Sequence, residues 1–155
     1  MPSHSNDISM LIQEATRWLA SRSIAQWETP WSDEWIAWKV EIGEFYCVFE
    51  GDVMVGVVRL IWSDTEMWDE SADSAGYVHT LIVRRDFTGH GIGRVVLGWA
   101  EEQCLRRGAE YLRLDCRASN PELNRYYVEQ GFVACGEKTV DGYCGRLYQK
   151  RLVIP

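Results

Sequence analysis

Three glycines stand at alternate positions in Thr88-Gly89-His90-Gly91-Ile92-Gly93-Arg94, between an apolar run and an amphipathic stretch. Glycine lets the backbone turn sharply, so that consecutive N–H groups point toward one place. The helix expected from residue 92 adds unpaired N–H donors and the positive end of its dipole. A diphosphate fits such a turn. A glycine-rich loop that binds nothing could have the same sequence.

Two other nucleotide-binding patterns compete for this segment. A dinucleotide-binding fingerprint has G-x-G-x-x-G opening a helix directly after a strand, but Val96 occupies the third glycine position counted from Gly91. Asp115 lies near the distance expected for a ribose-binding acid, yet too little chain remains for a doubly wound sheet. A Walker A loop is excluded because no Lys-Ser/Thr pair follows the last glycine.

The segment resembles the acetyl-CoA signature of the GNAT acetyltransferase superfamily. That signature is a strand ending in apolar-x-Val, a short turn, and then R/Q-x-x-G-x-G/A. Leu81-Ile82-Val83 matches the strand end, and residues 88–93 match the glycine turn. Thr88 departs from the usual Arg or Gln, which removes one side-chain contact to the diphosphate. Arg94 and Arg85 are the candidates to replace it.

A second motif extends the resemblance. The family has an asparagine, a tyrosine seven residues later, and Gly-Phe four and five residues after the tyrosine. Asn120, Tyr127, Gly131 and Phe132 have this spacing, and the resemblance covers about residues 43 to 150. It implies an α/β (α+β) fold of the GNAT type. That fold is a mixed, mostly antiparallel sheet of six to seven strands with helices on both faces, here in one domain over residues 1–155.

The resemblance implies acetyl transfer from acetyl-CoA to an amine by direct attack in a ternary complex, without an acyl-enzyme. Backbone N–H groups near the end of the strand would hold the pantetheine arm and polarise the thioester carbonyl. Helix capping alone explains Asn120, so its bond to the cofactor is a separate expectation. The expected cofactor-binding residues are Leu81, Ile82, Val83, Thr88, Gly89, His90, Gly91, Ile92, Gly93, Arg94 and Asn120.

Tyr127 and His79 are the expected catalytic residues. A tyrosine with its ordinary pKa near 10 stays protonated and can donate to the departing thiolate. Tyr126 is adjacent, but its spacing to Gly131 is off by one. Strand alternation places His79 on one face with Leu81, and arylalkylamine acetyltransferases have a histidine at the similar position. An imidazole there can accept the proton of the amine, directly or through water. The alternatives are that Tyr127 is only a packing residue and that His79 is only a hydrogen-bonded histidine of the strand.

Other chemistry-bearing residues do not form sites. His90 lies inside the glycine turn, where it can donate to a phosphate but is badly placed for a base. Cys116 and Cys135 have no His–acid partner near them in the sequence, which excludes a cysteine nucleophile. The five cysteines include no C-x-x-C pair, and the three histidines complete no metal spacing. We therefore expect free thiols, a reducing compartment and no metal.

The composition of the chain limits the classes of molecule that it is expected to bind. The chain has 155 residues with a net charge of −7, which argues against nucleic-acid binding because phosphate contacts need a basic patch. No stretch approaches 18 apolar residues and the N-terminus is polar, so we expect no membrane span or signal peptide and a cytoplasmic location. The sequence does not fix the oligomeric state, and a homodimer is compatible with it.

The elements that must position these residues can be read from the hydrophobic pattern. Asp7 is expected to cap a first helix, and residues 63–75, rich in acids, should be a solvated loop. The order predicted is α-α-β-β-β-α-β-α-β-β, which indicates a mixed sheet with helices on both faces. The predicted strands and helices are residues 8–19, 35–40, 45–50, 53–62, 77–83, 92–104, 111–116, 121–130, 132–135 and 143–152.

The acceptor is the least determined part of the function. The family usually walls this site with its N-terminal helices and its final hairpin, which here carry Trp27, Trp31, Trp35, Trp38 and Tyr143. Core packing explains the tryptophans, but aromatic faces could also hold an ammonium, and the acidic loop could steer cations. We therefore expect a small primary amine. The alternatives are a protein N-terminus or lysine as acceptor, a CoA-binding regulatory module without turnover, and a dinucleotide-binding protein.

Overall fold

The structure, a computed structural model, describes residues 4–21, 31–69 and 73–153. Its helices and strands are α1 (Ser5–Ser21), α2 (Asp33–Glu41), β1 (Phe45–Glu50), β2 (Val53–Ile61), α3 (Thr65–Trp68), β3 (Ala75–Val83), the 3-10 turn η1 (Arg85–Phe87), α4 (Ile92–Arg106), β4 (Tyr111–Arg117), α5 (Pro121–Glu129), β5 (Val133–Val140) and β6 (Tyr143–Arg151). The strands form one six-stranded sheet in the order β1-β2-β3-β4-β6-β5. The predicted mixed, mostly antiparallel sheet with helices is confirmed.

The chain divides into two compact units, Met1–Leu60 with Thr80–Val96 and Ile61–His79 with Leu97–Pro155. The elements β2, β3 and α4 each run from one unit into the other. That the whole chain is one domain stays a prediction.

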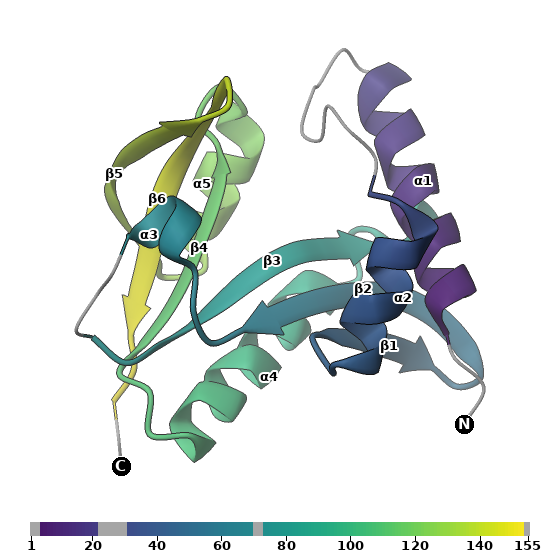
Figure 1. Cartoon of the computed structure of the whole chain (residues 1–155), viewed down its shortest axis with the longest axis horizontal. Helices are drawn as coiled ribbons and strands as arrows, with labels where there is room; N and C mark the ends of the chain where they lie inside the picture. The colour runs from purple at the N-terminus through teal and green to yellow at the C-terminus, as the bar shows by residue number, and fades with distance from the viewer. Residues whose placement is uncertain (1–3, 22–30, 70–72, 154–155) are drawn as a thin grey trace. The chain divides into compact units, whose positions relative to one another are not determined.

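In the first unit, α1 packs on α2 and α2 contacts β1 (Figure 1). β1 and β2 form an antiparallel hairpin that closes at Glu50↔Val53, so Gly51 and Asp52 make the two-residue turn between the two predicted strands. Helix α1 begins at Ser5, so Asp7 lies in its first turn and the prediction that it caps the helix is wrong. The buried core of this unit consists of Ile8, Leu11, Ile12, Ile36, Phe45, Val57 and Ile82.

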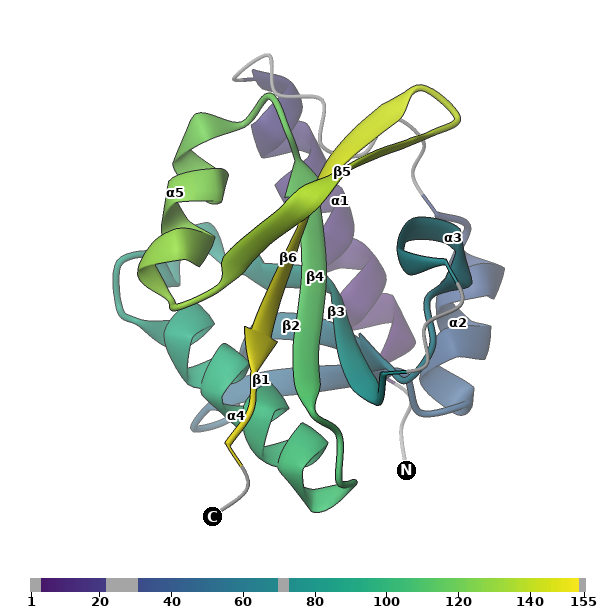
Figure 2. The same cartoon turned by 90° about the vertical axis from the view of Figure 1, so that its left-hand side faces the viewer.

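In the second unit, β3 runs parallel to β4, and β6 is antiparallel to both β4 and β5. Helices α5 and α3 lie on opposite sides of β4 and β6 (Figure 2). Successive side chains on β4 point to opposite faces. Cys116 therefore faces α5, where its sulfur contacts Asn124, and Asp115 faces the other side.

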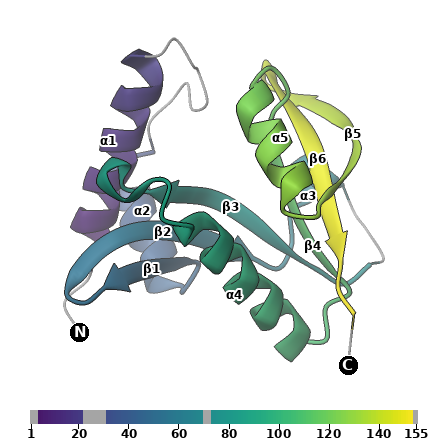
Figure 3. The ribbon, with the colours of Figure 1, turned by 180° about the vertical axis from the view of Figure 1, so that it is seen from behind.

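Helix α4 follows the glycine turn after β3 and is seen from behind in Figure 3. It ends at Arg106, and Gly108 then adopts a φ of 72°, the left-handed conformation typical of a glycine C-cap. The helix predicted over residues 92–104 is confirmed, and it continues to Arg106.

Two segments differ from the sequence predictions. The acidic loop is not simply solvated, because Asp64 caps the short helix α3 and Met67 is buried. Glu70 lies outside the described residues. Strand β5 continues to Val140, beyond the predicted end at Cys135. Pairing with β6 explains this length, since cross-strand contacts run from Val133↔Gln149 to Val140↔Tyr143. Among the described helices, none combines the length and apolar character needed to cross a bilayer.

Candidate active site

The glycine turn has the backbone conformation that its sequence predicts. Gly89 and Gly91 have φ values of 83° and 75°, in the left-handed region that favours glycine. A Cβ built on either residue would meet nothing within 4 Å, so the space in front of both is open. Their positive φ angles therefore reflect the path of the backbone and the direction of its amides, and side-chain crowding does not impose them.

Helix α4 begins directly after this turn. The N–H of Val95 donates to the carbonyl of Gly91 at 3.1 Å, which is the first hydrogen bond of the helix. The N–H groups of Ile92, Gly93 and Arg94 therefore precede the helical ladder and have no carbonyl partner within it. The helix dipole adds a positive field at the same place. The first turn of the helix thus offers several backbone donors to an anion.

The side chains of the turn have more local roles than the sequence suggested. The Thr88 hydroxyl donates to the carbonyl of Arg85 at 2.8 Å and so closes η1. The Arg85 guanidinium lies 3.6 Å from the ring centroid of Trp18. Arg94 is exposed, and His90 is exposed with its ring edge against Phe87. Of the two arginines expected to compensate for Thr88, Arg85 is therefore engaged with Trp18, whereas Arg94 is exposed on the first turn of α4.

Strand β3 is irregular next to His79. Thr80 has a φ of 45°, which is rare for a β-branched residue and marks a local break in the strand. The parallel ladder with β4 ends just before it, at Val78↔Leu114. The simple alternation that grouped His79 with Leu81 is therefore interrupted. Ile82 beyond the break is buried in the core of the first unit.

Tyr127 is buried in the second unit on α5. Its ring packs edge-on against Tyr126 and Phe132, with centroid distances of 5.3 and 5.9 Å. Burial raises the pKa of Tyr127 above its ordinary value, and nearby Cys116, Tyr126 and Asp115 raise it further. The phenol therefore keeps its proton over the whole physiological range.

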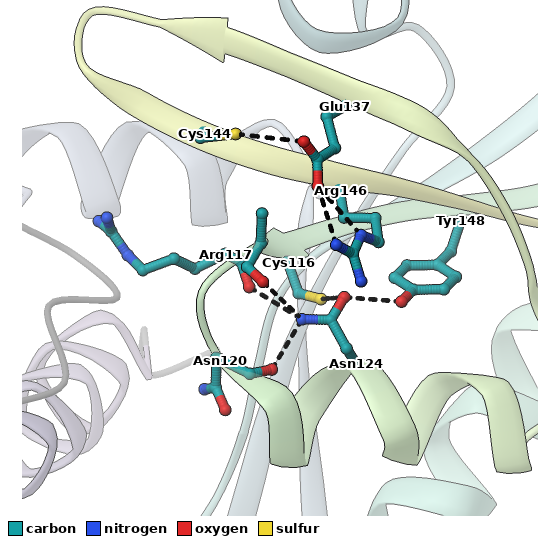
Figure 4. Close-up of polar contacts among 9 residues, drawn as sticks. Cys116, Arg117, Asn120, Asn124, Glu137, Cys144, Arg146 and Tyr148 are labelled. Atoms are coloured by element: carbon teal, nitrogen blue, oxygen red, sulfur yellow. Dashed lines mark hydrogen bonds and ion pairs between the residues drawn. The ribbon is translucent and has the colours of Figure 1, made fainter.

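Two asparagines shape the connection between β4 and α5. The Asn120 side chain accepts from the N–H of Leu123 at 3.2 Å and caps α5, as predicted. The buried Asn124 donates to the carbonyls of Arg117 and Asn120 at 3.1 and 2.7 Å (Figure 4). Its side-chain oxygen accepts from the Tyr148 hydroxyl at 2.6 Å. Asn124 therefore fixes the loop that presents α5, a role that the sequence analysis missed.

His79 lies in a cluster with two carboxylates. Its Nε2 is 2.8 Å from Oδ2 of Asp64, whose side chain is only 7% exposed. One ligating atom each of Asp64, His79 and Asp115 lies within 4.8 Å of the others. The Tyr143 hydroxyl donates to Asp115 at 2.9 Å. Side chains from the N-cap of α3, from β4 and from β6 thus gather near the imidazole on β3.

Burial dominates the electrostatics of this cluster. It raises the pKa of Asp115, while the charge of His79 and the Tyr143 hydrogen bond act in the opposite direction. Burial also raises the pKa of Tyr143, as does the Asp115 carboxylate that its hydroxyl contacts. Asp115 also contributes to the raised pKa of Tyr127, after burial, Cys116 and Tyr126.

Comparison with known proteins decides the family. The family model described as "Acetyltransferase (GNAT) family" matches residues 12–132, which is more than half of the chain. The chain belongs to the GNAT acetyltransferase family. It is thus an N-acetyltransferase of the family that uses acetyl-CoA as donor, and the resemblance inferred from the two motifs is confirmed.

Several relatives are similar to this GNAT chain. An uncharacterized N-acetyltransferase of Bacillus subtilis, YesJ, is 28% identical over 94% of this chain and 83% of its own. The aminoalkylphosphonate N-acetyltransferase of Salmonella typhimurium is 31% identical over 49% of each chain. A GNAT acetyltransferase from Listeria monocytogenes superposes with a TM-score of 0.81 and 29% identity, covering 98% of this chain and 91% of the other.

The glycine turn of this GNAT enzyme has features that suit an anion such as a diphosphate. These are the open space in front of Gly89 and Gly91, the N–H groups that precede the helical ladder of α4, and the helix dipole. All three belong to the backbone, so they do not depend on the side chain at Thr88.

The two cysteines considered as nucleophiles have raised pKa values. All five cysteines are free, and burial raises the pKa of Cys116 to about 12. Burial also raises the pKa of the exposed Cys135. A thiol acts as a nucleophile at neutral pH when its pKa is lowered, which is not the case for Cys116 or Cys135.

The tryptophans near the N-terminus mainly pack. Trp31 and Trp35 stack with centroids 5.5 Å apart and lie against the core of the first unit. Lys39 Nζ lies 4.0 Å from the ring centroid of Trp38, and the Arg59 guanidinium lies 5.1 Å from that of Trp35. The rings of Trp35 and Trp38 are thus each already in contact with a cation of the chain itself. Trp27 lies outside the described residues.

Sequence reasoning missed the carboxylates around His79. Asp64 was assigned to a solvated loop, although an aspartate directly before Thr-Glu-Met-Trp is a helix-capping signal. Asp115 was considered only as a ribose-binding acid, and Tyr143 only as an aromatic wall. The register of β4 against β3 and β6 brings these side chains together, and no local pattern specifies that register.

Proposed function

We propose that this chain transfers an acetyl group from acetyl-CoA to the primary amine of a small molecule, by direct attack in a ternary complex. The polar cluster around His79 carries this proposal, because it supplies a base and negative charge next to one another. An acceptor amine is largely protonated at neutral pH and must lose a proton before it can attack.

The cofactor would be held mainly by backbone groups. The amides of residues 89–94 bind the diphosphate, and Arg94 adds charge to them. The backbone of Leu81, Ile82 and Val83 holds the pantetheine arm and stabilises the oxyanion. The Asn120 oxygen is used as a helix cap, which leaves its amide N–H group for the cofactor. Bound acetyl-CoA supplies the acetyl thioester.

Two side chains would move the protons. His79 accepts the proton that the attacking amine loses. Tyr127 donates its phenolic proton to the departing thiolate, and its raised pKa keeps that proton available at neutral pH. One proton of the ammonium group would pass to solvent before the attack. His79 would take the second proton from the attacking nitrogen, and return of a proton from His79 through solvent to the Tyr127 phenolate would restore both side chains.

A small acceptor is favoured by charge and by one relative. Asp64 and Asp115 place two acidic groups beside His79, which suits a compact cation. The Salmonella relative is named for a small amine, an aminoalkylphosphonate. A cytoplasmic location and an active homodimer would both be compatible with this activity.

A panel assay tests the proposal. The protein is incubated with acetyl-CoA and with alkylamines, arylalkylamines, aminoalkylphosphonates and short peptides, and release of free thiol is followed. We expect turnover with at least one class of small amine, at a kcat/KM at least ten times that for any peptide. Preference for peptides would assign the enzyme to protein acetylation. Calorimetry showing no association with CoA or acetyl-CoA would remove the cofactor assignment itself.

A further inference from the structure

Asp64 is held in place more firmly than a loop residue usually is. Its Oδ1 accepts from the N–H of Met67 at 3.2 Å, and its backbone carbonyl accepts from the N–H of Trp68 at 3.0 Å. Its other carboxylate oxygen faces His79 Nε2 at 2.8 Å. The start of α3 therefore aims one oxygen of Asp64 at one nitrogen of the imidazole.

This contact fixes the tautomer of His79. An ionised carboxylate only accepts hydrogen bonds, so the nitrogen facing it must carry the proton. In neutral His79 the proton then resides on Nε2, and Nδ1 keeps the lone pair. The alternative tautomer would place the Nε2 lone pair 2.8 Å from a carboxylate oxygen, which is repulsive.

We propose that Asp64 is a positioning residue that makes Nδ1 of His79 the proton-accepting atom. During acetyl transfer an N–H bond of the acceptor amine breaks and an Nδ1–H bond forms, while Nε2–H keeps donating to Asp64. The resulting imidazolium lies beside Asp64 and Asp115, whose charges are opposite to its own. The assignment of His79 as base rests on the proposed function. The tautomer does not.

The surroundings of His79 come from several elements. Asp64 and Glu66 belong to α3 and its cap, Asp115 to β4 and Tyr143 to β6. Glu66 and Asp64 both raise the pKa of Asp115. The pH response of the cluster therefore belongs to these groups together, and Asp64 is distinguished from the others by its hydrogen bond to Nε2.

The variant Asp64→Asn changes the group that faces His79 but keeps the cap of α3, so it tests the positioning role without disturbing the fold. Asparagine caps helices as well as aspartate does, so its oxygen keeps the bond to Met67 and its NH₂ group turns toward Nε2. Nε2 must then accept, and the proton moves to Nδ1. Asp69→Asn is the matched control, because Asp69 is an exposed acid of the same segment that pairs with Lys138. Both variants are expected to melt within about 2 °C of the wild type.

The tautomer is read by ¹⁵N long-range correlation NMR on chelator-treated protein, with His79→Gln identifying the signals. We expect Nε2–H in the wild type and in Asp69→Asn, and Nδ1–H in Asp64→Asn. With the best amine, kcat of Asp64→Asn should fall by about 10²–10⁴-fold while KM for acetyl-CoA stays unchanged. Asp69→Asn should keep wild-type kcat.

Three results would overturn the proposal. The first is an Nδ1–H tautomer in the wild type. The second is an Asp64→Asn protein with an unchanged tautomer or an unchanged kcat. The third is a shift of the His79 signals on adding one equivalent of Zn²⁺, with higher activity, because this would make the cluster a metal site. If no amine is acetylated, the NMR result still stands, so failure of the proposed function is distinguishable.

Discussion

Tyr127 and Tyr126 are neighbours in sequence with different surroundings. Tyr127 is buried among Phe132, Tyr148 and Tyr126, whereas Tyr126 is only half-buried. Both pKa values are raised by burial, but only that of Tyr127 is also raised by neighbouring acidic groups. The spacing to Gly131 and the burial thus select the same tyrosine as the proton donor.

Tyr127→Phe should lower kcat by about 10²-fold or more and leave the Kd for CoA within twofold of the wild type, because only proton donation is lost. Tyr126→Phe, the same change one residue earlier, should keep kcat. Steady-state kinetics and calorimetry on both variants check this. A loss of kcat in Tyr126→Phe with normal kcat in Tyr127→Phe would reverse the assignment.

Asp115 should make the protein less stable as the pH rises. Burial raises its pKa in the folded state above 3.8, so folding favours the protonated form. That contribution is complete below the unfolded pKa and is lost as the pH rises through the folded pKa. The Asp115→Asn variant has no carboxyl group at this position, so this loss of stability with rising pH should disappear. The amide oxygen of the asparagine can still accept from the Tyr143 hydroxyl.

Urea unfolding between pH 3.5 and 7 measures this effect. We expect the stability of Asp115→Asn relative to the wild type to increase as the pH rises. A difference between Asp115→Asn and the wild type that stays constant with pH would mean that burial does not perturb this carboxyl group.

At the scale of elements, the start of α4 and the turn before it form the cradle. Gly91 and Gly98 both have open space around an added Cβ, but only Gly91 has a positive φ. Neither position lacks space for a methyl group, so a comparison of the two glycines isolates the effect of the positive φ at Gly91.

Gly91→Ala should destabilise the protein by about 1 kcal/mol, because alanine is strained at positive φ. It should also weaken CoA binding at least tenfold, since the turn must relax away from its present amide directions. Gly98→Ala, inside α4, should stabilise by up to about 1 kcal/mol and leave CoA binding unchanged. Calorimetry and thermal denaturation test both variants. Equal CoA affinity in both variants would show that the cofactor does not bind at this turn.

At the scale of the whole molecule, the two compact units share backbone. β2, β3 and α4 each continue from one into the other, so neither unit is a contiguous piece of chain. We therefore expect one calorimetric transition, with calorimetric and van't Hoff enthalpies equal. Saturation with CoA at 100 times its Kd should add about 2.7 kcal/mol to the stability of that single transition. Two transitions, or a shift of only one of them, would contradict the one-domain prediction.

The sequence by itself determined the family, the cofactor class and most elements. The glycine turn, the Asn120–Tyr127–Gly131–Phe132 spacing and the caps of α4 and α5 are local signals, because they act within one turn or one helix. The end of β5 was misjudged, since its pairing with β6 is not local.

Only the tertiary structure brought Asp64, Asp115 and Tyr143 to His79. These residues are separated by 15 to 79 positions in the chain, and each is explained by a bland local role when considered alone. Their meeting depends on the parallel pairing of β3 with β4, the antiparallel register of β6 and the short helix α3. Register and close packing arise from contacts between distant segments, so no local pattern in the sequence could have specified this cluster.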